Sequence, residues 1–245
     1  MTATLPSLSA PLETLLAAAK ARYDVAFEPV SVGGTTLDIL QITDMDAYVE
    51  RLLADLPPGM PLELPFWARL WRTSFLLAYF VQRLAPDGRS LLEIGAGLGM
   101  VGLFAAARGF DVTLTDIHPE ALLFSQINVL QNGLEGRARV ARADFTKDRL
   151  GRRFDCIVGS EVLYIEKDYK PMVKFLLAHL SEEPGAEVVL AKEYSRKAKK
   201  FFRKAQDHFL TSELTMGYKE DGQDAGDAAT GEKHLAQIIR MKRRP

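Results

Sequence analysis

A glycine-rich turn between two apolar segments constrains the fold of this chain more than any other feature. Residues 91–94 read as a buried strand, and the segment Gly-Ala-Gly-Leu-Gly at 95–99 follows directly. A second strand, at 111–115, ends at Asp116. Because glycine has no Cβ, a ligand can lie against bare backbone at the carboxyl end of the first strand, where open α/β sheets bind ligands. An acidic side chain about twenty residues further on can accept hydrogen bonds from a ribose. The pattern predicts a cofactor that contains a nucleoside.

The spacing of the glycines separates two classes of cofactor. A dinucleotide site requires Gly-x-Gly-x-x-Gly, with the pyrophosphate at the helix N-terminus. Here the third glycine, Gly99, comes one residue early, and Met100 stands in the place of the last glycine. Glu93 would bring negative charge near an anionic pyrophosphate, whereas it suits the sulfonium and ammonium groups of S-adenosylmethionine. S-adenosylmethionine is therefore favoured over NAD.

Composition limits the other classes of function. With 245 residues and 47% hydrophobic content the chain can bury one large core, and a net charge of −1 gives no general reason to bind nucleic acid or an anionic membrane. No basic segment precedes an apolar core near the first residue, and no apolar run approaches membrane-spanning length, so we expect a cytoplasmic protein. The one cysteine, Cys156, is expected to be buried. The histidines lack metal-ligand spacing, so no metal site is expected: His118, His179, His208 and His234.

Two regions are expected, divided near residue 60. Residues 1–60 read as an N-terminal extension without recognisable chemistry, in which Gly33-Gly34 marks a hairpin turn. Residues 61–245 read as the cofactor domain. The elements expected in the extension are a helix at 12–21, strands at 25–32 and 36–42, and a helix at 44–56.

After a helix expected at 74–84, strands and helices alternate, which predicts a parallel sheet with helices on both faces. The chain ends on two strands joined only by the polar segment 220–232, which we read as a hairpin with a mobile loop. The fold class is therefore α/β: a Rossmann-like, doubly wound, mostly parallel seven-stranded sheet ending in an antiparallel hairpin. The expected strands are 90–94, 111–115, 138–142, 154–159, 186–191, 209–218 and 234–242, and the expected helices are 98–108, 118–131, 166–180 and 195–207.

Five motifs in this order resemble those of class I (seven-strand) S-adenosylmethionine-dependent methyltransferases, in particular methyltransferase family 16, which includes many protein-lysine methyltransferases. The resemblance covers roughly residues 60–245. Its motifs are Phe-Trp-Ala-Arg-Leu-Trp at 66–71, Glu-Ile-Gly-Ala-Gly-Leu-Gly at 93–99, Asp116, Asp144-Phe145 and Ser-Glu-Val-Leu-Tyr at 160–164. The resemblance implies S-adenosylmethionine as methyl donor, S-adenosylhomocysteine as product, and these cofactor-binding residues: Trp71, Glu93, Gly95, Ala96, Gly97, Gly99, Asp116, Ile117, Asp144, Phe145 and Ser160.

Two of these motifs can also be interpreted from their own chemistry. Asp144 follows the third strand of the cofactor domain, so its carboxylate can accept a hydrogen bond from an adenine amino group, and Phe145 can cover the ring. Trp67 and Trp71 are four residues apart and would share one face of a helix. The resemblance implies that Trp71 is a wall near the cofactor, and Arg69 is expected to be solvated.

Glu161 and Tyr164 are the candidate catalytic residues. They follow the fourth strand of the cofactor domain, next to the expected place of the transferable methyl group. The family's lysine methyltransferases usually carry Asp-x-x-Tyr here, and this chain keeps the carboxylate with one more methylene. A carboxylate and a phenol beside a narrow site can hold and orient a lysine amine. We assign Glu161 to substrate binding and orientation and Tyr164 to shaping the channel, with a protein lysine as the expected acceptor.

Other functions stay open at this point. A methyltransferase for a small molecule or an RNA base is the first alternative, and an NAD-dependent oxidoreductase or a scaffold that binds the cofactor without turnover is more distant. The basic run within 196–204 would suit RNA or an acidic protein surface, but apolar residues such as Phe201 supply a counter-face, so a solvated helix face is favoured. No membrane partner is expected, and the sequence gives no indication of oligomeric state.

Overall fold

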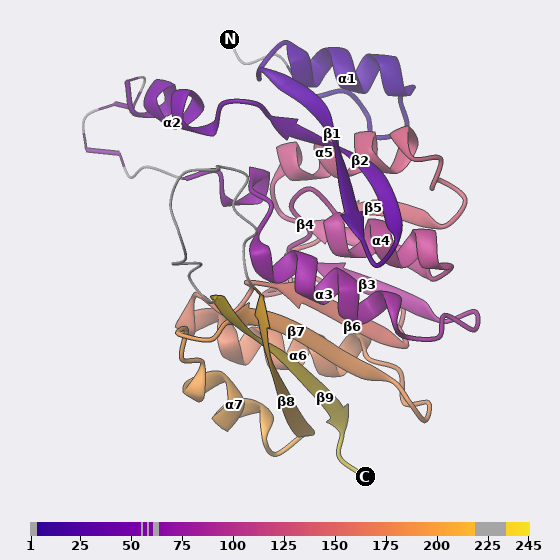
Figure 1. The fold of residues 1–245 in the computed structure, drawn as a ribbon. Helices are drawn as coiled ribbons and strands as arrows, with labels where there is room; N and C mark the ends of the chain where they lie inside the picture. Colours follow the sequence, from indigo (N-terminus) through magenta and orange to yellow (C-terminus); the bar gives the residue numbers. More distant parts are fainter. Residues whose placement is uncertain (1–3, 55, 58, 61–63, 219–233) are drawn as a thin grey trace, which may run out of the picture.

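The computed structural model describes residues 4–54, 56, 57, 59, 60, 64–218 and 234–245, and within them it contains the expected α/β sheet (Figure 1). The sheet has seven strands in these residues, in the order β5-β4-β3-β6-β7-β9-β8. The five strands from β5 to β7 are parallel, whereas β9 runs antiparallel to both β7 and β8. The prediction of a mostly parallel sheet closed by an antiparallel hairpin is confirmed. The strands are β3 (Ser90–Ile94), β4 (Asp111–Asp116), β5 (Ala138–Arg142), β6 (Cys156–Ser160), β7 (Glu187–Glu193), β8 (Phe209–Tyr218) and β9 (His234–Arg243).

Helices cover both faces of this sheet. Successive residues of a strand point to opposite faces, and here apolar residues lie on both faces. Leu91 belongs to the hydrophobic cluster under α3 (Arg72–Gln82), α4 (Met100–Arg108) and α5 (Pro119–Gln131). Its neighbour Leu92 belongs to the cluster under α6 (Tyr169–His179) and α7 (Lys199–Ala205). Figure 1 shows α3 and α6 on opposite sides of the central strands. The apolar strands are therefore buried on both faces of the sheet, as in other parallel sheets.

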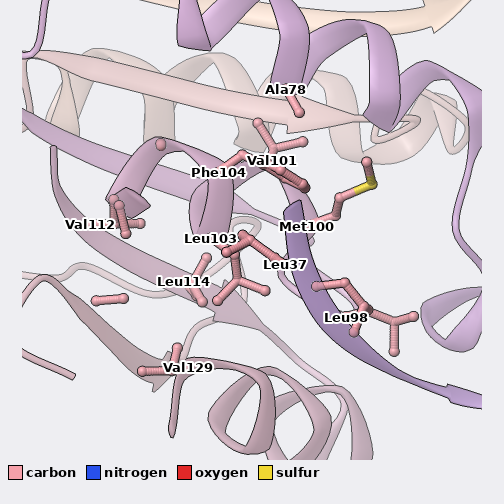
Figure 2. Packing of buried hydrophobic residues seen from close by; sticks show 14 of the residues in the cluster. Leu37, Ala78, Leu98, Met100, Val101, Leu103, Phe104, Val112, Leu114 and Val129 are labelled. Carbon is pink, nitrogen blue, oxygen red and sulfur yellow. The ribbon is translucent and has the colours of Figure 1, made fainter. Parts of the chain in front are cut away.

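The larger cluster places α4 close against the sheet that it follows. In Figure 2, Val101 and Phe104 of α4 lie between Ala78 of α3 and Val112 and Leu114 of β4. A Cβ on Gly102, in the middle of α4, would lie 2.2 Å from a methyl group of Leu114. This close approach fixes the start of α4, and with it the glycine turn, relative to the ends of β3 and β4.

The N-terminal residues fold as expected and pack against the helices of the large sheet. They form α1 (Leu12–Lys20), a two-stranded antiparallel sheet of β1 (Val25–Val32) and β2 (Thr35–Ile42), and α2 (Met45–Ala54). The turn of this hairpin lies at Gly33-Gly34, as predicted. Ile39 and Leu40 of β2 are fully buried in the same hydrophobic cluster as Leu91 of the large sheet. The division of the chain at residue 60 stays a prediction.

A buried asparagine on α5 joins this hairpin to the glycine turn. The Asn128 side chain is fully buried; its Oδ1 accepts a hydrogen bond from Leu40 N at 2.7 Å, and its Nδ2 donates to Leu98 O at 3.0 Å. One turn later, the half-buried Asn132 makes a similar pair of bonds with the backbone of Asp38. The two asparagines hold β2 against α5, but only Asn128 also reaches the turn after β3.

We expect Asn128→Ala to lower the free energy of unfolding by about 2–4 kcal/mol, because a buried amide and a buried carbonyl each lose their partner. Asn132→Ala is the matched control on the same helix, and it is expected to cost about 1 kcal/mol since the groups it frees are open to water. Urea unfolding of both variants measures the difference. Equal losses would show that Asn128 is no more important than its neighbour.

The structure corrects several element boundaries. The helix predicted at 98–108 begins at Met100, because Gly99 adopts a left-handed φ of 81° that cannot continue an α-helix. The helix predicted at 195–207 begins at Lys199, because the residues before it form a turn after β7. The strand predicted from 154 begins at Cys156, since Phe154 makes only an isolated bridge to Leu180. The predicted helix at 166–180 opens with a 3₁₀ turn, η2 (Glu166–Asp168), ahead of α6.

Three remaining predictions concern single features. Cys156 is fully buried, as expected, and burial raises the pKa of its thiol to about 12. None of the helices in the described ranges combines the length and the apolar character that crossing a bilayer requires. The predicted mobile loop at 220–232 lies outside the described residues.

Candidate active site

A cavity of ≈ 530 Å³ opens at the carboxyl ends of β3, β4 and β6. The strand order reverses between β3 and β6, and open α/β sheets bind ligands at such a switch point. All the predicted site residues line this cavity except Gly99. Gly99 is buried ahead of α4, where a Cβ would lie 3.0 Å from the Ser125 hydroxyl, so its role is to turn the chain into the helix.

The glycine turn has a fixed shape because its backbone is bonded from both sides. Gly97 N donates to Oδ2 of Asp116 at 2.9 Å, and Ser125 Oγ donates to Gly97 O at 2.8 Å. Gly97 has a φ of 56°, and a Cβ there would lie 2.7 Å from the backbone oxygen of Trp67. The segment that carries Trp67 therefore closes over the turn at a distance that only glycine permits.

Asp116 joins the glycine turn to the loop after β4. Its buried carboxylate accepts hydrogen bonds from the backbone N–H groups of Gly97, Ile117 and His118 at 2.7–3.0 Å. A carboxylate offers about four acceptor positions, so one remains for a hydroxyl in the cavity. The side chain predicted to bind a ribose thus also organises the loops around it.

Glu93 lies under the same turn, buried at the N-terminus of α4. Its Oε2 accepts a hydrogen bond from Gly102 N at 2.7 Å. Burial raises the pKa of this carboxyl from 4.5 to about 8, although the backbone N–H groups of Gly102 and Val101 oppose the rise. At neutral pH this carboxyl is therefore mostly protonated, and a cation in the cavity would favour its ionisation.

The free energy of unfolding is expected to fall as the pH rises, because of Glu93. Its folded-state pKa of about 8 is above the usual 4.5, so the folded protein keeps a proton that the unfolded chain releases between these values. The free energy of unfolding should decline over this window by up to about 1.4 kcal/mol per pH unit from this group. Urea unfolding at pH 5.5, 7.0 and 8.5, roughly the span of the window, should give a shallower decline for Glu93→Gln. Parallel curves for the two proteins would contradict the assignment.

Asp144 and Phe145 form the wall of the cavity beyond β5. Oδ1 of Asp144 accepts hydrogen bonds from N and Oγ1 of Thr146, and Lys147 Nζ lies 3.3 Å from its Oδ2. Burial alone would raise the pKa of Asp144, but the bonds from Thr146 and Lys147 lower it below its usual value. Phe145 is half-buried against the smaller cluster and presents an aromatic surface to the cavity. The Asp144 carboxylate could accept a hydrogen bond from the amino group of an adenine, and the Phe145 ring could cover the face of the base.

Trp67 and Trp71 do not share a helix face, which corrects the helical interpretation of this segment. The 3₁₀ turn η1 (Phe66–Ala68) is followed by extended backbone at Arg69, and Trp71 precedes α3. Trp67 packs edge-on against Tyr23 and Phe124. Trp71 donates its Nε1–H to Phe66 O at 3.1 Å and lines the cavity. The exposed Arg69 is not only solvated, because its guanidinium lies 5.3 Å from the centre of the Trp71 ring.

Glu161 turns out of β6 in a conformation that few residues adopt. Its φ is 53°, and its N donates to Ala191 O of β7 at 2.9 Å. A non-glycine residue in the left-handed region carries strain, which commonly occurs at functional sites. This kink aims the Glu161 side chain into the cavity, while Tyr164, at the mouth, is 57% exposed. The preceding Ser160 hydroxyl hydrogen-bonds to Thr73 Oγ1 on α3 at 2.8 Å.

The Glu161 carboxylate is held by the turn that follows β7. Its Oε1 accepts a hydrogen bond from Glu193 N at 2.7 Å. Its Oε2 lies 3.1 Å from Nε of Arg196, close enough for an ion pair, but the N–H is not aligned for a hydrogen bond. Burial raises the pKa of Glu161 above its usual value, and the Arg196 charge works against the rise. Within the described residues no cluster of His, Cys, Asp and Glu side chains is arranged to hold a metal ion.

Sequence reasoning missed the part played by Arg196. This residue was grouped with the basic run around α7 and interpreted as part of a solvated face, but it lies before the helix and lines the cavity. Its partner Glu161 is 35 positions earlier in the chain, so no local pattern links them. Leu64, His118, Lys167 and Asp168 also line the cavity without a signal in the sequence.

Two solved methyltransferase structures have the same fold as this chain. An S-adenosylmethionine-dependent methyltransferase from Agrobacterium tumefaciens is 17% identical, with a TM-score of 0.59, and the match covers 89% of this chain and 70% of that one. The Pyrococcus abyssi tRNA (uracil-54, C5)-methyltransferase, solved with S-adenosylhomocysteine, is 15% identical with a TM-score of 0.54, covering 88% of this chain and 44% of that one. At these identities the likeness shows the fold alone.

Three relatives in sequence carry the names of protein methyltransferases. EEF1A lysine methyltransferase 3 of Mus musculus is 34% identical over 155 residues, which cover 61% of this chain and 66% of that protein, just under two thirds. Protein N-lysine methyltransferase METTL21A of Danio rerio is 26% identical over 171 residues, covering 63% and 77% of the two chains. A histidine protein methyltransferase 1 homolog of Dictyostelium discoideum is 33% identical, covering 59% of this chain and 48% of that protein.

The family itself is shown by a match over most of the cofactor domain. The model of the lysine methyltransferase family matches residues 67–208, which include the glycine turn, Asp116, Glu161 and Arg196. This match confirms the predicted resemblance, the enzyme class and S-adenosylmethionine as the methyl donor, and it removes the NAD-dependent alternative. The chain belongs to the lysine methyltransferase family, methyltransferase family 16.

Proposed function

We propose that this enzyme transfers a methyl group from S-adenosylmethionine to the side-chain amine of a lysine in a protein. The observation that carries the proposal is the buried Glu161 carboxylate, which a left-handed backbone turns into the cavity beside Tyr164. The names of the mouse and zebrafish relatives, which are protein lysine methyltransferases, support the same acceptor.

The cavity residues fit the proposed methyl donor. The bare backbone of the glycine turn leaves room for a ligand, Asp116 has an acceptor position for a ribose hydroxyl, and Asp144 with Phe145 can meet an adenine. Glu93 supplies a carboxyl that a cation would ionise. We propose these residues, with Trp71, Gly95, Ala96, Gly97, Ile117 and Ser160, as the cofactor-binding set.

When bound, S-adenosylmethionine supplies an activated methyl group whose carbon–sulfur bond breaks as a carbon–nitrogen bond forms, with the electron pair left on sulfur. The protein therefore has mainly to position the amine in line with that bond, and orientation can lower a barrier by about 7–11 kcal/mol in favourable cases. Glu161 orients the amine and Tyr164 shapes its channel. A lysine amine, with a solution pKa of about 10.4, must lose its proton before it reacts.

Incubation of the enzyme with methyl-labelled S-adenosylmethionine and cell extract tests the acceptor. We expect label that protease removes and nuclease does not, and hydrolysis of the labelled protein should yield N-methyl-lysine. Label in methyl-histidine would assign a different side chain, while nuclease-sensitive or low-mass label would assign RNA or a small molecule. Extract treated with heat-inactivated enzyme is the control. A cytoplasmic location stays a prediction and can be checked with a fluorescent fusion.

A further inference from the structure

The end of the cavity next to β6, where we propose that the lysine amine binds, is called the acceptor end. It contains the Glu161 carboxylate, and the Arg196 guanidinium lies beside that carboxylate. The side chain of Glu161 is 8% exposed and that of Arg196 is 37% exposed, with 3.1 Å between Oε2 and Nε. Both atoms are buried, and neither makes a hydrogen bond. The guanidinium cannot lose its proton in a protein, so its charge is permanent. Because the two side chains share no aligned hydrogen bond, they act on each other through charge.

The turn after β7 is built to place Arg196 at this position. Lys192 is 3% exposed, and its Nζ donates to Arg196 O at 2.7 Å and to Glu193 O at 3.3 Å. Glu193 N in turn donates to Oε1 of Glu161. The turn is thus bonded to Glu161 at one point and to a buried lysine at two others. Arg196 is the side chain that this arrangement brings to the carboxylate.

The other charged groups around the pair balance one another. Lys192 and Glu193 are neighbours on β7 with opposite charges, and so are Lys167 and Asp168, which also line the cavity. The phenols of Tyr164 and Tyr169 are neutral near pH 7, since a phenol titrates near about 10 and burial raises both pKa values further. The net charge that an incoming amine meets at this end of the cavity therefore depends on Glu161 and Arg196. A lone carboxylate would hold a lysine in its charged, unreactive form, since an opposite charge nearby favours ionisation.

We infer that Arg196 neutralises Glu161, so that the acceptor site does not retain the ammonium form of the substrate, and the lysine releases its proton to solvent water as it enters as the neutral amine. This inference rests on the proposed function. Arg196 is a positioning residue, since it acts through the Glu161 carboxylate and not on the transferred group. The carboxylate then orients the neutral amine by accepting its N–H, while the guanidinium prevents the site from raising the pKa of that amine.

Sinefungin tests this inference without a known protein substrate. In this analogue a carbon that bears a primary amine replaces the methylated sulfur of S-adenosylmethionine, so its ammonium group enters the acceptor end of the cavity. S-adenosylhomocysteine is the matched ligand without that charge. In Arg196→Gln we expect the affinity for sinefungin, relative to that for S-adenosylhomocysteine, to rise about tenfold, because Glu161 is left without its neutralising charge. Isothermal titration calorimetry at pH 7.5, about three pH units below the lysine reference pKa, measures both ligands.

Two further variants separate charge from structure. Arg196→Lys keeps the charge and should keep the wild-type ratio of affinities, and the double variant E161Q/R196Q should return to that ratio because it has neither charge. An unchanged ratio in Arg196→Gln would overturn the inference, as would an equal loss of both affinities, which indicates a structural role. If the wild-type enzyme bound no S-adenosylhomocysteine, the proposed cofactor site would fail instead, and the two failures are thereby distinguishable.

Discussion

Replacing Gly97 by alanine is expected to weaken the binding of S-adenosylhomocysteine by about 100-fold or more. A Cβ at this position would lie 2.7 Å from the backbone oxygen of Trp67, and the φ of 56° costs an alanine roughly 1–2 kcal/mol. Either the glycine turn or the Trp67 segment must move, and both line the cavity. A combined cost near 3 kcal/mol corresponds to about two orders of magnitude in affinity. Calorimetric titration measures the loss directly.

Gly136→Ala is the matched control for this variant. A Cβ on Gly136 meets nothing within 4 Å, and this glycine is not in the left-handed region. Its affinity and its unfolding temperature should equal those of the wild-type enzyme. If Gly97→Ala is too unstable for calorimetry, the thermal shift of that variant in excess S-adenosylhomocysteine, compared with the shift of Gly136→Ala, gives a second comparison. Wild-type affinity in a folded Gly97→Ala protein would contradict the close approach of Trp67.

Glu161→Gln is expected to reduce methyl transfer by about 100-fold while the affinity for S-adenosylhomocysteine changes by less than about threefold. The amide keeps the size of the side chain but cannot form the ion pair with Arg196, and it orients an amine less well than a carboxylate. Because the glycine turn and Asp116 are unaffected, cofactor binding should survive. Transfer of labelled methyl groups to protein in cell extract measures the rate.

Glu161→Asp is the informative companion, since the shorter acid is what the family usually carries here. It should retain more activity than Glu161→Gln, because it keeps the charge and only shifts its position by one methylene. Normal turnover by Glu161→Gln would remove the carboxylate from the mechanism. Loss of S-adenosylhomocysteine binding in both variants would show instead that Glu161 supports the cofactor site.

The fold followed from the sequence to the extent that its signals are local. The apolar runs of β3 and β4, the turn at Gly33-Gly34 and the long terminal strands β8 and β9 each carry a pattern within ten residues. Element ends were less well predicted because they depend on contacts from elsewhere. The start of α7 is one example: Lys192 bonds the carbonyl of Arg196 and so holds the preceding residues in a turn.

The candidate site likewise has one part that the sequence predicts and one part that it does not. The glycine turn and Asp116 were predictable because strand order and chain spacing alone bring them together. The Glu161–Arg196 pair depends on a positive φ at Glu161 and on a turn after β7 that is hydrogen-bonded to Glu161. Neither feature can be recognised from the amino-acid sequence. The Trp67–Trp71 interpretation was wrong because spacing of four fits a helix only if the segment is helical, and the backbone at Arg69 is extended.

The packing of Trp67 has a consequence for how mutational screens of this enzyme should be interpreted. Its ring lies against Tyr23 and Phe124, while its backbone oxygen touches the glycine turn. None of the described residues before Leu64 lines the cavity. Even so, a substitution at Tyr23 would shift the Trp67 ring and, through the Trp67 backbone, the glycine turn of the cavity. A screen scored on activity would then classify Tyr23 as an active-site residue, although it lies outside the cavity.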